Sequence, residues 1–298
     1  MDDKYLINNK FRLKITDKCN LNCFFCHAEG APGVNDINVQ DRTFHEAINL
    51  LRTIYNRIHI TGGEPTIHKD LGKIVDQLLS LGYEVSMTSN GLFNIKRHLS
   101  TLSKLSYLNL SIHSLCPGYI SLLSNNKYSE KMVSLIKQNI IDLKDILPIR
   151  INTVVTGKQQ NIQELIDFAS LLRVEIKLIP EWNNRVIAQS TIKSLLLNNK
   201  FELFEIIHIV PGSNLRKRYK NVKNQIIEVK EIDLFRPSFL CDNCSPAQTL
   251  LCQEGFSFLR LEDSPIRFRL CIFRHSEQCN TQTISNIKRM FAEISNNQ

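Results

Sequence analysis

Three cysteines near the start of the chain, Cys19, Cys23 and Cys26, form a C-x3-C-x2-C arrangement. Three thiolates at this spacing can wrap a single soft metal centre. A [4Fe–4S] cluster held by three cysteines keeps one iron open for a further ligand, whereas a structural zinc site usually closes with a fourth protein ligand. Because His27 follows directly and would supply that fourth ligand, a zinc site is the alternative interpretation.

A second motif, Thr61-Gly62-Gly63-Glu64-Pro65, follows a predicted strand. Paired glycines let the backbone come close to a ligand, and a glutamate offers a carboxylate to an amine. Such a turn is weak evidence when it stands alone. Because this turn follows a strand and lies downstream of the cysteine motif, it favours a [4Fe–4S] cluster with one open iron over a zinc site.

The elements that must position these motifs follow a regular alternation as far as Trp182. The predicted strands cover 11–16, 57–61, 83–88, 107–112, 150–155 and 174–179, and the predicted helices cover 43–55, 71–81, 95–104, 129–143 and 162–172. Strands that alternate with helices build βαβ units and a parallel sheet. The pattern predicts an α/β fold, a partial (β/α)6 TIM-type barrel, in which chemistry gathers where the strands end.

Beyond Trp182 the alternation fades. The basic segment 216–230 is predicted to be a solvated linker face, and cysteines crowd the residues after it. We therefore divide the chain into a barrel (1–182), a connecting segment (183–240) and a cysteine-rich, cluster-binding extension (241–298).

The composition describes a globular protein with a large core, since 43% of its 298 residues are hydrophobic and 22% are charged. The net charge of +8 favours an anionic partner. No apolar run approaches the roughly 18 residues of a membrane helix, and the first residues lack the features of a secretory signal, so we expect a cytoplasmic protein without a membrane partner. In a reducing compartment, nine cysteines bind metal more often than they form disulfides.

The cysteine motif and the Gly-Gly-Glu-Pro turn together resemble those of the radical S-adenosylmethionine (radical SAM) superfamily. In that superfamily the open iron binds S-adenosylmethionine (AdoMet), and the reduced cluster cleaves it to a 5′-deoxyadenosyl radical. The catalytic cluster ligands that the resemblance implies are Cys19, Cys23 and Cys26. The residues that it implies for AdoMet are Gly62, Gly63 and Glu64 at the methionine amine and Phe25 at the adenine.

Longer stretches resemble the GTP 3′,8-cyclase (MoaA) family, at residues 12–21, 59–65, 88–91, 109–114, 151–155 and 259–261. Further AdoMet contacts that this likeness implies are Ser111 and Trp182. The nucleotide contacts that it implies are Arg12, Thr88, Arg150 and Arg260. An arginine suits a phosphate, because its planar fork donates two hydrogen bonds and stays charged.

Departures from the cyclase pattern bear on the substrate. His59 and Phe258 stand where the cyclases have arginine, Trp182 stands at a methionine position, and His113 ends a Ser-x-His pattern in place of Ser-x-Asp. The loss of these two cationic side chains argues against GTP as the substrate, because fewer charged donors remain to bind its triphosphate. We expect a MoaA-like enzyme that abstracts hydrogen from another phosphorylated, nucleotide-like substrate, for cyclisation or C–C bond formation.

The resemblance also extends to the C-terminal cysteines, Cys241, Cys244, Cys252, Cys271 and Cys279. The cyclases hold an auxiliary cluster in this region, and 252–255 resembles the SPASM and twitch domains of peptide-modifying radical SAM enzymes. Both likenesses imply a second iron–sulfur cluster, with Cys279 spare. The expected ligands are Cys241, Cys244, Cys252 and Cys271. A structural zinc site on the same thiols is the alternative.

The implied reaction needs AdoMet, an electron from a flavodoxin- or ferredoxin-type partner, and an anionic small molecule as substrate. A ribosomally made peptide is the competing substrate. A zinc-binding protein without enzymatic activity would need no AdoMet, so iron content and AdoMet cleavage separate it from either enzyme.

Overall fold

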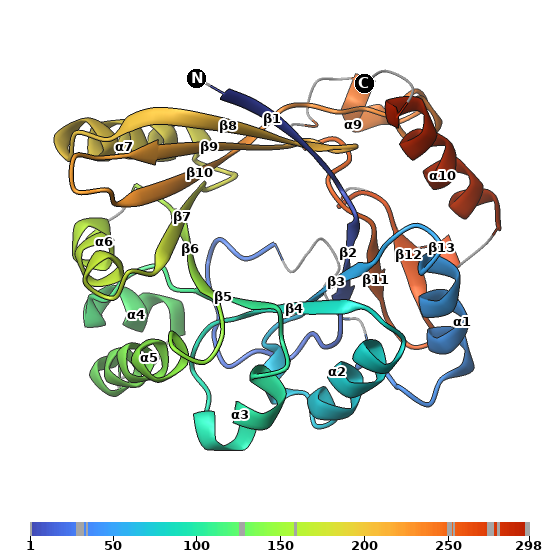
Figure 1. The fold of residues 1–298 in the computed structure, drawn as a ribbon, viewed down its shortest axis with the longest axis horizontal. Helices are drawn as coiled ribbons and strands as arrows, with labels where there is room; N and C mark the ends of the chain where they lie inside the picture. Colours follow the sequence, from blue (N-terminus) through green and yellow to red (C-terminus); the bar gives the residue numbers. More distant parts are fainter. Residues whose placement is uncertain are drawn as a thin grey trace.

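The computed structural model describes residues 2–27, 33, 35–124, 129–157, 160–248, 252, 254–272, 277–278 and 281–295. The strands predicted from the sequence form the curved wall of a barrel (Figure 1). They are β2 (Lys10–Lys14), β3 (Arg57–Thr61), β4 (Glu84–Ser89), β5 (Tyr107–Ser111), β6 (Ile149–Val155) and β7 (Glu175–Pro180). Each pairs in parallel with the next along the chain, which confirms the predicted partial (β/α)6 barrel.

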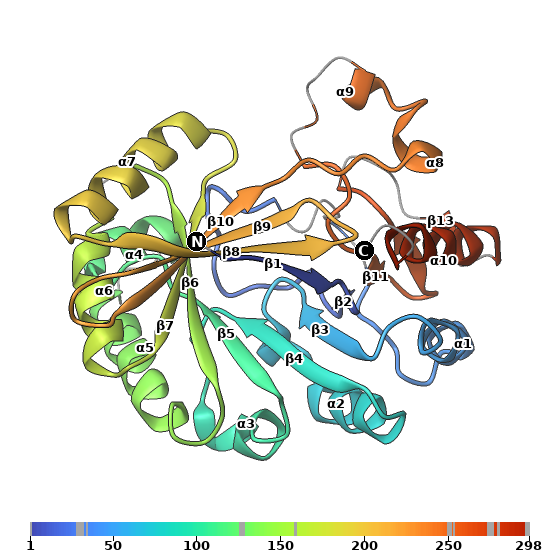
Figure 2. The same ribbon diagram turned by 45° about the horizontal axis from the view of Figure 1, so that its top comes forward.

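Helices cover the outer face of this wall (Figures 1 and 2). They are α1 (Arg42–Leu51), α2 (Leu71–Ser80), α3 (Ile95–Leu102), α4 (Pro117–Ser124), α5 (Ser129–Leu143) and α6 (Ile162–Leu171). In α1 the buried residues Phe44, Ala47, Ile48 and Leu51 recur at the spacing of one helical face. Its first turn is capped by Asp41, which accepts a hydrogen bond from the Thr43 N–H at 2.9 Å.

Further strands extend the sheet beyond β7. They are β1 (Asp2–Ile7), β8 (Glu202–Val210), β9 (Asn214–Lys220) and β10 (Ile226–Ile232). β10 pairs in parallel with β7, β9 lies antiparallel between β8 and β10, and β1 pairs in parallel with β8. The chain runs from β1 almost directly into β2, and Asn8 between them donates hydrogen bonds to the carbonyls of Val210 and Ser257 at 2.6 and 3.1 Å. These contacts draw the two sides of the wall together.

The basic segment 216–230 is therefore not a solvated linker, because most of it forms β9 and β10. Its cations find partners across the strands rather than in water. Arg218 contacts Glu205 on β8 at 2.6 Å, and Lys217 contacts Glu231 on β10 at 2.8 Å. Such cross-strand pairs allow a strand without apolar alternation to join a sheet.

The C-terminal part packs beside β2 and α1 (Figure 2). β11 (Arg260–Glu262) pairs in parallel with β2, and β12 (Arg267–Arg269) and β13 (Glu277–Gln278) continue the sheet. The helices of this part are α8 (Ser238–Cys241), α9 (Ser245–Gln248) and α10 (Thr281–Ser295), whereas α7 (Arg185–Asn198) packs against β6 and β7 on the side of α6. A small second core unites Leu240, Phe256, Cys271 and Met290. Cys279 lies outside the described residues.

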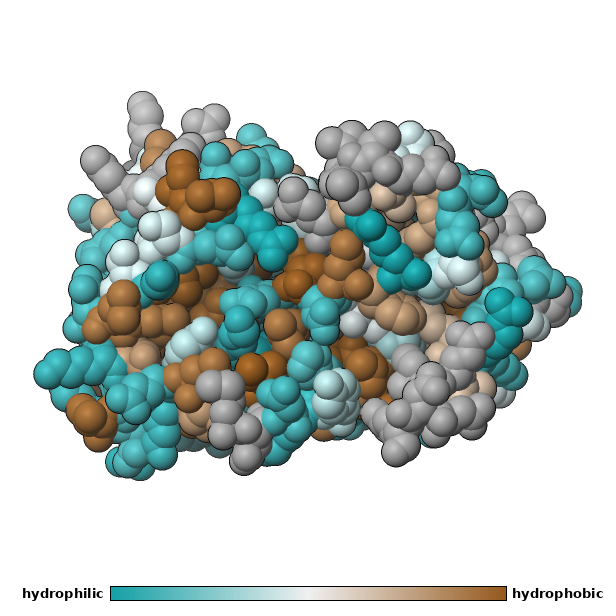
Figure 3. Space-filling model, turned by 90° about the horizontal axis from the view of Figure 1, so that it is seen from above, coloured by the Kyte–Doolittle hydropathy of each residue, from teal (hydrophilic) through white to brown (hydrophobic). Residues whose placement is uncertain are grey.

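Hydrophobic and hydrophilic side chains are interspersed on the face seen in Figure 3. The main core is formed by the strands and the apolar faces of the surrounding helices. No helix in the described ranges is both long and apolar enough to span a bilayer.

Candidate active site

The barrel encloses a cavity of about 720 Å³. One end is lined by Cys23 and Phe25, from the loop after β2 that we call the cysteine loop (residues 19–26). The other end is lined by Lys10 and Tyr107, the first residues of β2 and β5. Since parallel strands all end at the same edge, the loops that follow β2 to β6 meet at the cysteine end of the cavity.

The thiols of the cysteine loop influence one another's ionisation. Burial, together with the neighbouring Cys26 and Cys19 thiolates, raises the pKa of Cys23 to about 12. Cations stabilise thiolates, so a bound cationic centre would reverse this effect. The three are free thiols, the donor set of a three-cysteine cluster, although no three Cys, His, Asp or Glu side chains of the described ranges already stand in a metal-binding arrangement.

Glycines let the end of β3 lie directly against the cysteine loop. The Gly63 N–H donates to the Thr16 carbonyl at 2.7 Å, and the Glu64 N–H donates to the Lys18 carbonyl at 2.8 Å. A Cβ on Gly62 would stand 2.7 Å from the Thr16 oxygen, and one on Gly63 would collide with the Lys18 oxygen. The Gly-Gly motif thus creates the close approach that an AdoMet site beside the loop requires.

Glu64 is buried, and its carboxylate accepts four hydrogen bonds from the protein. Oε1 accepts from the Thr66 N–H, the Thr66 hydroxyl and the Ser89 hydroxyl at 3.1, 2.7 and 2.8 Å. Oε2 accepts from the Asn90 N–H at 2.7 Å. In this geometry the carboxylate ties the turn after β3 to the end of β4, which differs from the direct amine contact that the resemblance implies.

Asn90 continues this chain of contacts to the cysteine loop. Its side-chain amide donates to the Asn20 side-chain oxygen at 2.6 Å and to the Cys19 sulfur at 3.9 Å. Glu64, Asn90 and Cys19 therefore form one connected structure across three strand ends. Sequence reasoning did not single out Asn90, although the Thr-Ser-Asn-Gly motif after β4 was the available signal.

Phe25 and His113 form the side of the cavity next to the cysteine loop. Their rings pack edge to face, with centroids 4.8 Å apart. The Val154 N–H donates to Nδ1 of His113 at 3.1 Å. Burial lowers the pKa of His113 to about 4, so the imidazole is neutral at physiological pH.

Cationic side chains dominate the rest of the lining. They are Lys10, Arg12, Arg57, Arg150, Lys177, Arg216 and Lys230. Among the described lining residues, Glu64 is the one carboxylate. Arg12 and Lys10 both lie over the ring of Phe258, at 4.8 and 5.4 Å from its centroid. An excess of positive charge inside a water-poor cavity favours an anionic ligand.

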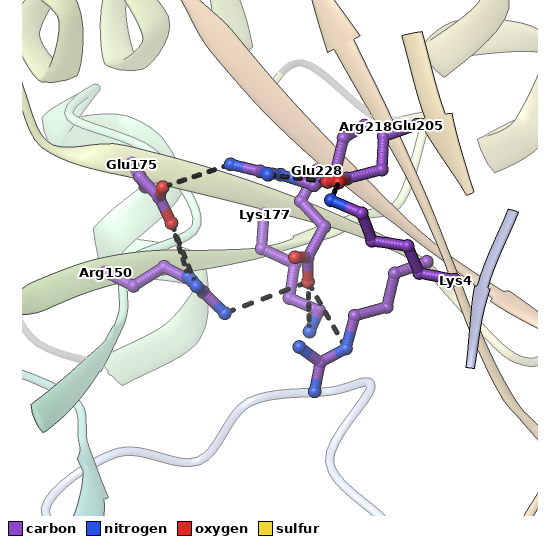
Figure 4. A network of polar contacts seen from close by, with 8 residues as sticks. Lys4, Arg150, Glu175, Lys177, Glu205, Arg218 and Glu228 are labelled. Carbon is purple, nitrogen blue, oxygen red and sulfur yellow. Dashed lines mark hydrogen bonds and ion pairs between the residues drawn. The ribbon is translucent and has the colours of Figure 1, made fainter. Parts of the chain in front are cut away.

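Several of these cations surround one buried carboxylate outside the lining, Glu228 on β10 (Figure 4). Lys177 contacts it at 2.6 Å, and Arg216 and Arg150 lie 3.7 and 3.8 Å away. Burial disfavours the charge of Glu228, but the three cations outweigh burial and lower its pKa to about 2. Arg150 also contacts Glu175 at 2.9 Å. The network joins β6 and β7 of the barrel to the closing strands β9 and β10.

Thr88 lines the cavity and belongs to a hydrogen-bonded row across neighbouring strands. The two ring nitrogens of His59 lie 2.7 Å from the Thr88 hydroxyl and 2.8 Å from the Ser86 hydroxyl. Lys10 donates to the Tyr107 hydroxyl at 3.0 Å in the same region. His59, which stands at a cyclase arginine position, is therefore held by the wall rather than extended into the cavity.

The structure brings most of the predicted site residues together in the lining. These are Cys19, Cys23, Phe25, Cys26, Gly62, Gly63, Glu64, Thr88, Ser111, Arg12 and Arg150. Arg260 is not among them, because it is 3% exposed and its guanidinium contacts Glu254 at 3.3 Å. Trp182 lies half-buried in the loop after β7 and is also absent from the lining. Lys10, Lys177, Arg216 and Lys230 are lining cations that sequence reasoning missed.

The predicted ligands of a second cluster lie in the C-terminal part, all as free thiols. The Cys244 N–H donates to the Cys241 carbonyl at 3.1 Å, which forms a tight turn between these two. Cys252 and Cys271 are buried, and the Gly255 N–H donates to the Cys252 sulfur at 3.4 Å. That these four cysteines bind one cluster together stays a prediction.

Comparison with known proteins places this geometry in a family. The radical SAM superfamily model matches residues 13–172. A probable GTP 3′,8-cyclase of Saccharolobus solfataricus is 29% identical over 241 residues, which cover 78% of this chain and 77% of that protein. A probable GTP 3′,8-cyclase of Sulfolobus acidocaldarius is 34% identical over 175 residues, which cover 56% of this chain and 54% of that protein.

Solved structures show the same fold at low identity. Streptococcus suis SuiB bound to S-adenosylmethionine aligns with a TM-score of 0.52 and 16% identity, over 67% of this chain and 50% of that one. SuiB bound to its precursor peptide SuiA aligns with a TM-score of 0.51 and 17% identity, over 67% of this chain and 48% of that one. With its three-cysteine loop, its Gly-Gly-Glu turn and a model match over more than half its length, the chain belongs to the radical SAM superfamily.

Proposed function

We propose that this protein is a MoaA-like radical SAM enzyme that abstracts a hydrogen atom from a phosphorylated, nucleotide-like substrate. The observation that carries the proposal is the cavity, which joins the cysteine loop at one end to a cation-rich floor at the other. The cyclase relatives support a nucleotide-like substrate.

Cys19, Cys23 and Cys26 would hold the [4Fe–4S] cluster, which, when bound and reduced, supplies the electron that cleaves AdoMet to a 5′-deoxyadenosyl radical. The chain's own residues position this site. The turn at Gly63 docks the cysteine loop on β3, and Glu64 fixes that turn to the end of β4. An unselective radical requires a site from which water is excluded when substrate is bound.

The cations at the other end would orient the substrate. Arg12 reaches the lining from β2 and Arg150 from β6, and Lys230 and Arg216 reach it from the closing strands. Guanidinium and ammonium groups in such a setting bind phosphate through charge-assisted hydrogen bonds. Because His59 is engaged with Ser86 and Thr88, this set differs from that expected for GTP, and we propose a smaller phosphorylated ligand.

We also propose a second iron–sulfur cluster on Cys241, Cys244, Cys252 and Cys271, and reduction by a flavodoxin- or ferredoxin-type partner. The spacing of these free thiols supports the cluster. A ribosomal peptide is the competing substrate, suggested by the likeness of 252–255 to peptide-modifying enzymes.

The test is anaerobic reconstitution with iron and sulfide, followed by incubation with AdoMet and dithionite. Two [4Fe–4S] clusters would give about eight irons per chain, and 5′-deoxyadenosine should form. Zinc in place of iron, with no 5′-deoxyadenosine, would refute the proposal. Stimulation of AdoMet cleavage by phosphorylated nucleotides and not by peptides would identify the substrate class, and the opposite pattern would favour the peptide.

A further inference from the structure

His113 occupies an unusual position in the cavity wall. It follows β5, lines the cavity and is 7% exposed. Its ring packs edge to face against Phe25, which stands between Cys23 and Cys26 on the cysteine loop. The imidazole is thus next to the part of the site where AdoMet would bind under the proposed function, on which this inference rests.

The hydrogen bond from Val154 determines which nitrogen of His113 carries the proton. A backbone N–H can only donate, so Nδ1 of His113, 3.1 Å from the Val154 nitrogen, must accept and carries no proton. A neutral imidazole then has its proton on Nε2. Since burial lowers the pKa of His113 to about 4, the ring stays in this neutral form at physiological pH.

Gln160 holds the two strand ends in this relation. Its side-chain amide donates to the carbonyls of His113 and Val154 at 2.6 and 2.5 Å, and its side-chain oxygen accepts from the Thr156 N–H at 3.0 Å. Gln160 is 2% exposed, so water does not compete for these bonds. His113 is therefore held both at its backbone carbonyl and at Nδ1 of its ring.

The second ring nitrogen of His113 makes no hydrogen bond within the described residues. The contacts of the ring within the described residues are the Val154 amide at Nδ1 and the face of Phe25. Nε2 is not among the buried side-chain atoms of those residues that lack a partner. An unpaired donor that is not sealed in the protein, on a residue that lines the cavity, is available to a ligand.

We infer that His113 is a positioning residue for AdoMet, which presents a neutral Nε2–H as a hydrogen-bond donor to an acceptor atom of that molecule. An aspartate at this position, as in the cyclase pattern, would accept hydrogen bonds and add a negative charge. The histidine reverses the direction of the hydrogen bond to the ligand, because its Nε2–H donates and the ring carries no charge. The ligand atom opposite it must therefore be a hydrogen-bond acceptor.

Two substitutions separate donation to AdoMet from a merely structural role. His113→Gln can place an amide N–H near the position of Nε2, but it lacks the acceptor for the Val154 N–H. His113→Asn can offer an oxygen to the Val154 N–H, but its side chain is too short to place a donor near Nε2. The measurement is equilibrium dialysis of AdoMet against the anaerobically reconstituted protein, without reductant.

We expect His113→Asn to bind AdoMet about 10-fold more weakly than wild type, and His113→Gln to stay within about 3-fold. The reverse order would mean that His113 serves only to hold Val154, and equal binding by all three proteins would also overturn the inference. Failure of the wild-type protein to bind AdoMet would instead refute the proposed function itself.

Nitrogen-15 NMR of histidine-labelled protein tests the tautomer independently of AdoMet. The spectrum of His113, assigned by its absence in His113→Gln, should show an unprotonated Nδ1 and a protonated Nε2. A protonated Nδ1 would overturn the inference even if AdoMet binds.

Discussion

Replacing Glu228 by glutamine tests whether one buried carboxylate holds the closing strands to the barrel. Glu228 is 5% exposed and contacts Lys177 at 2.6 Å, with Arg216 and Arg150 at 3.7 and 3.8 Å. Glutamine keeps the shape and an acceptor oxygen but removes the charge. Lys177, Arg216 and Arg150 then lose their common counter-ion.

The pKa of Glu228 sets the magnitude. Burial acts against its charge, but the cations lower the pKa from the ordinary 4.5 to about 2. A difference of this size corresponds to about 3 kcal/mol of stability, within the range for breaking a buried ion pair. Because the folded pKa lies below the unfolded one, this contribution is fully present above pH 4.5 and is lost as the pH falls toward 2.

Urea unfolding at pH 7 measures the effect. Glu228→Gln should lower the free energy of unfolding by about 3 kcal/mol without changing the denaturant slope. The matched control is Glu175→Gln, whose side chain is 45% exposed and contacts Arg150 at 2.9 Å in the same network. An exposed pair contributes little, so the control should lose less than about 1 kcal/mol.

Two further results complete this test. The difference between wild type and Glu228→Gln should persist from pH 7 to about pH 4.5 and shrink at lower pH. Adding Lys177→Met to Glu228→Gln should recover part of the lost stability, because it removes one of the uncompensated cations. If Glu228→Gln unfolds at the same urea concentration as Glu175→Gln, the reasoning about this network is wrong.

The remaining predictions concern the cysteine loop and the cation-lined floor. Alanine at all three cysteines of the loop should abolish 5′-deoxyadenosine formation and leave about half the iron of the reconstituted protein; loss of all iron would contradict a second cluster. Gly63→Ala should lose AdoMet binding, because its Cβ would collide with the Lys18 carbonyl oxygen. The control variant Gly72→Ala, in α2, should retain AdoMet binding. Dialysis with labelled AdoMet compares the two variants. Arg12→Ala should weaken binding of inorganic triphosphate about 10-fold in low salt, and less as salt is added, by calorimetry; unchanged affinity would exclude Arg12 from the anion site.

The cysteine and glycine motifs were readable from the sequence because their chemistry is local. Three thiols within eight residues share one loop wherever the chain goes, and paired glycines after a strand mark a close backbone approach. The parallel strands were readable for a similar reason. Their short apolar runs alternate with helices, which leaves few other ways to pack.

The closing strands were not readable, because their charged residues have no apolar alternation. On β9, Arg216, Arg218 and Lys220 would suit a solvated loop equally well. Their strand structure depends on partners on the neighbouring strands, such as Glu205 on β8 and Glu228 on β10. The pattern of residue types along β9 alone does not predict this pairing.

The sequence by itself determined the fold class, and it predicted which residues carry the metal and cofactor chemistry, since both inferences rest on short-range spacing and periodicity. Only the tertiary structure decided which cations face the cavity: Arg260, predicted as a substrate contact, is buried against Glu254, while Lys177 and Lys230 reach the lining. It also decided that Glu64 ties strand ends together and that Nδ1 of His113 accepts a hydrogen bond from the Val154 N–H. The physical reason is that the partner of a charge or a hydrogen bond is set by distances between strands, which residues adjacent in sequence do not encode.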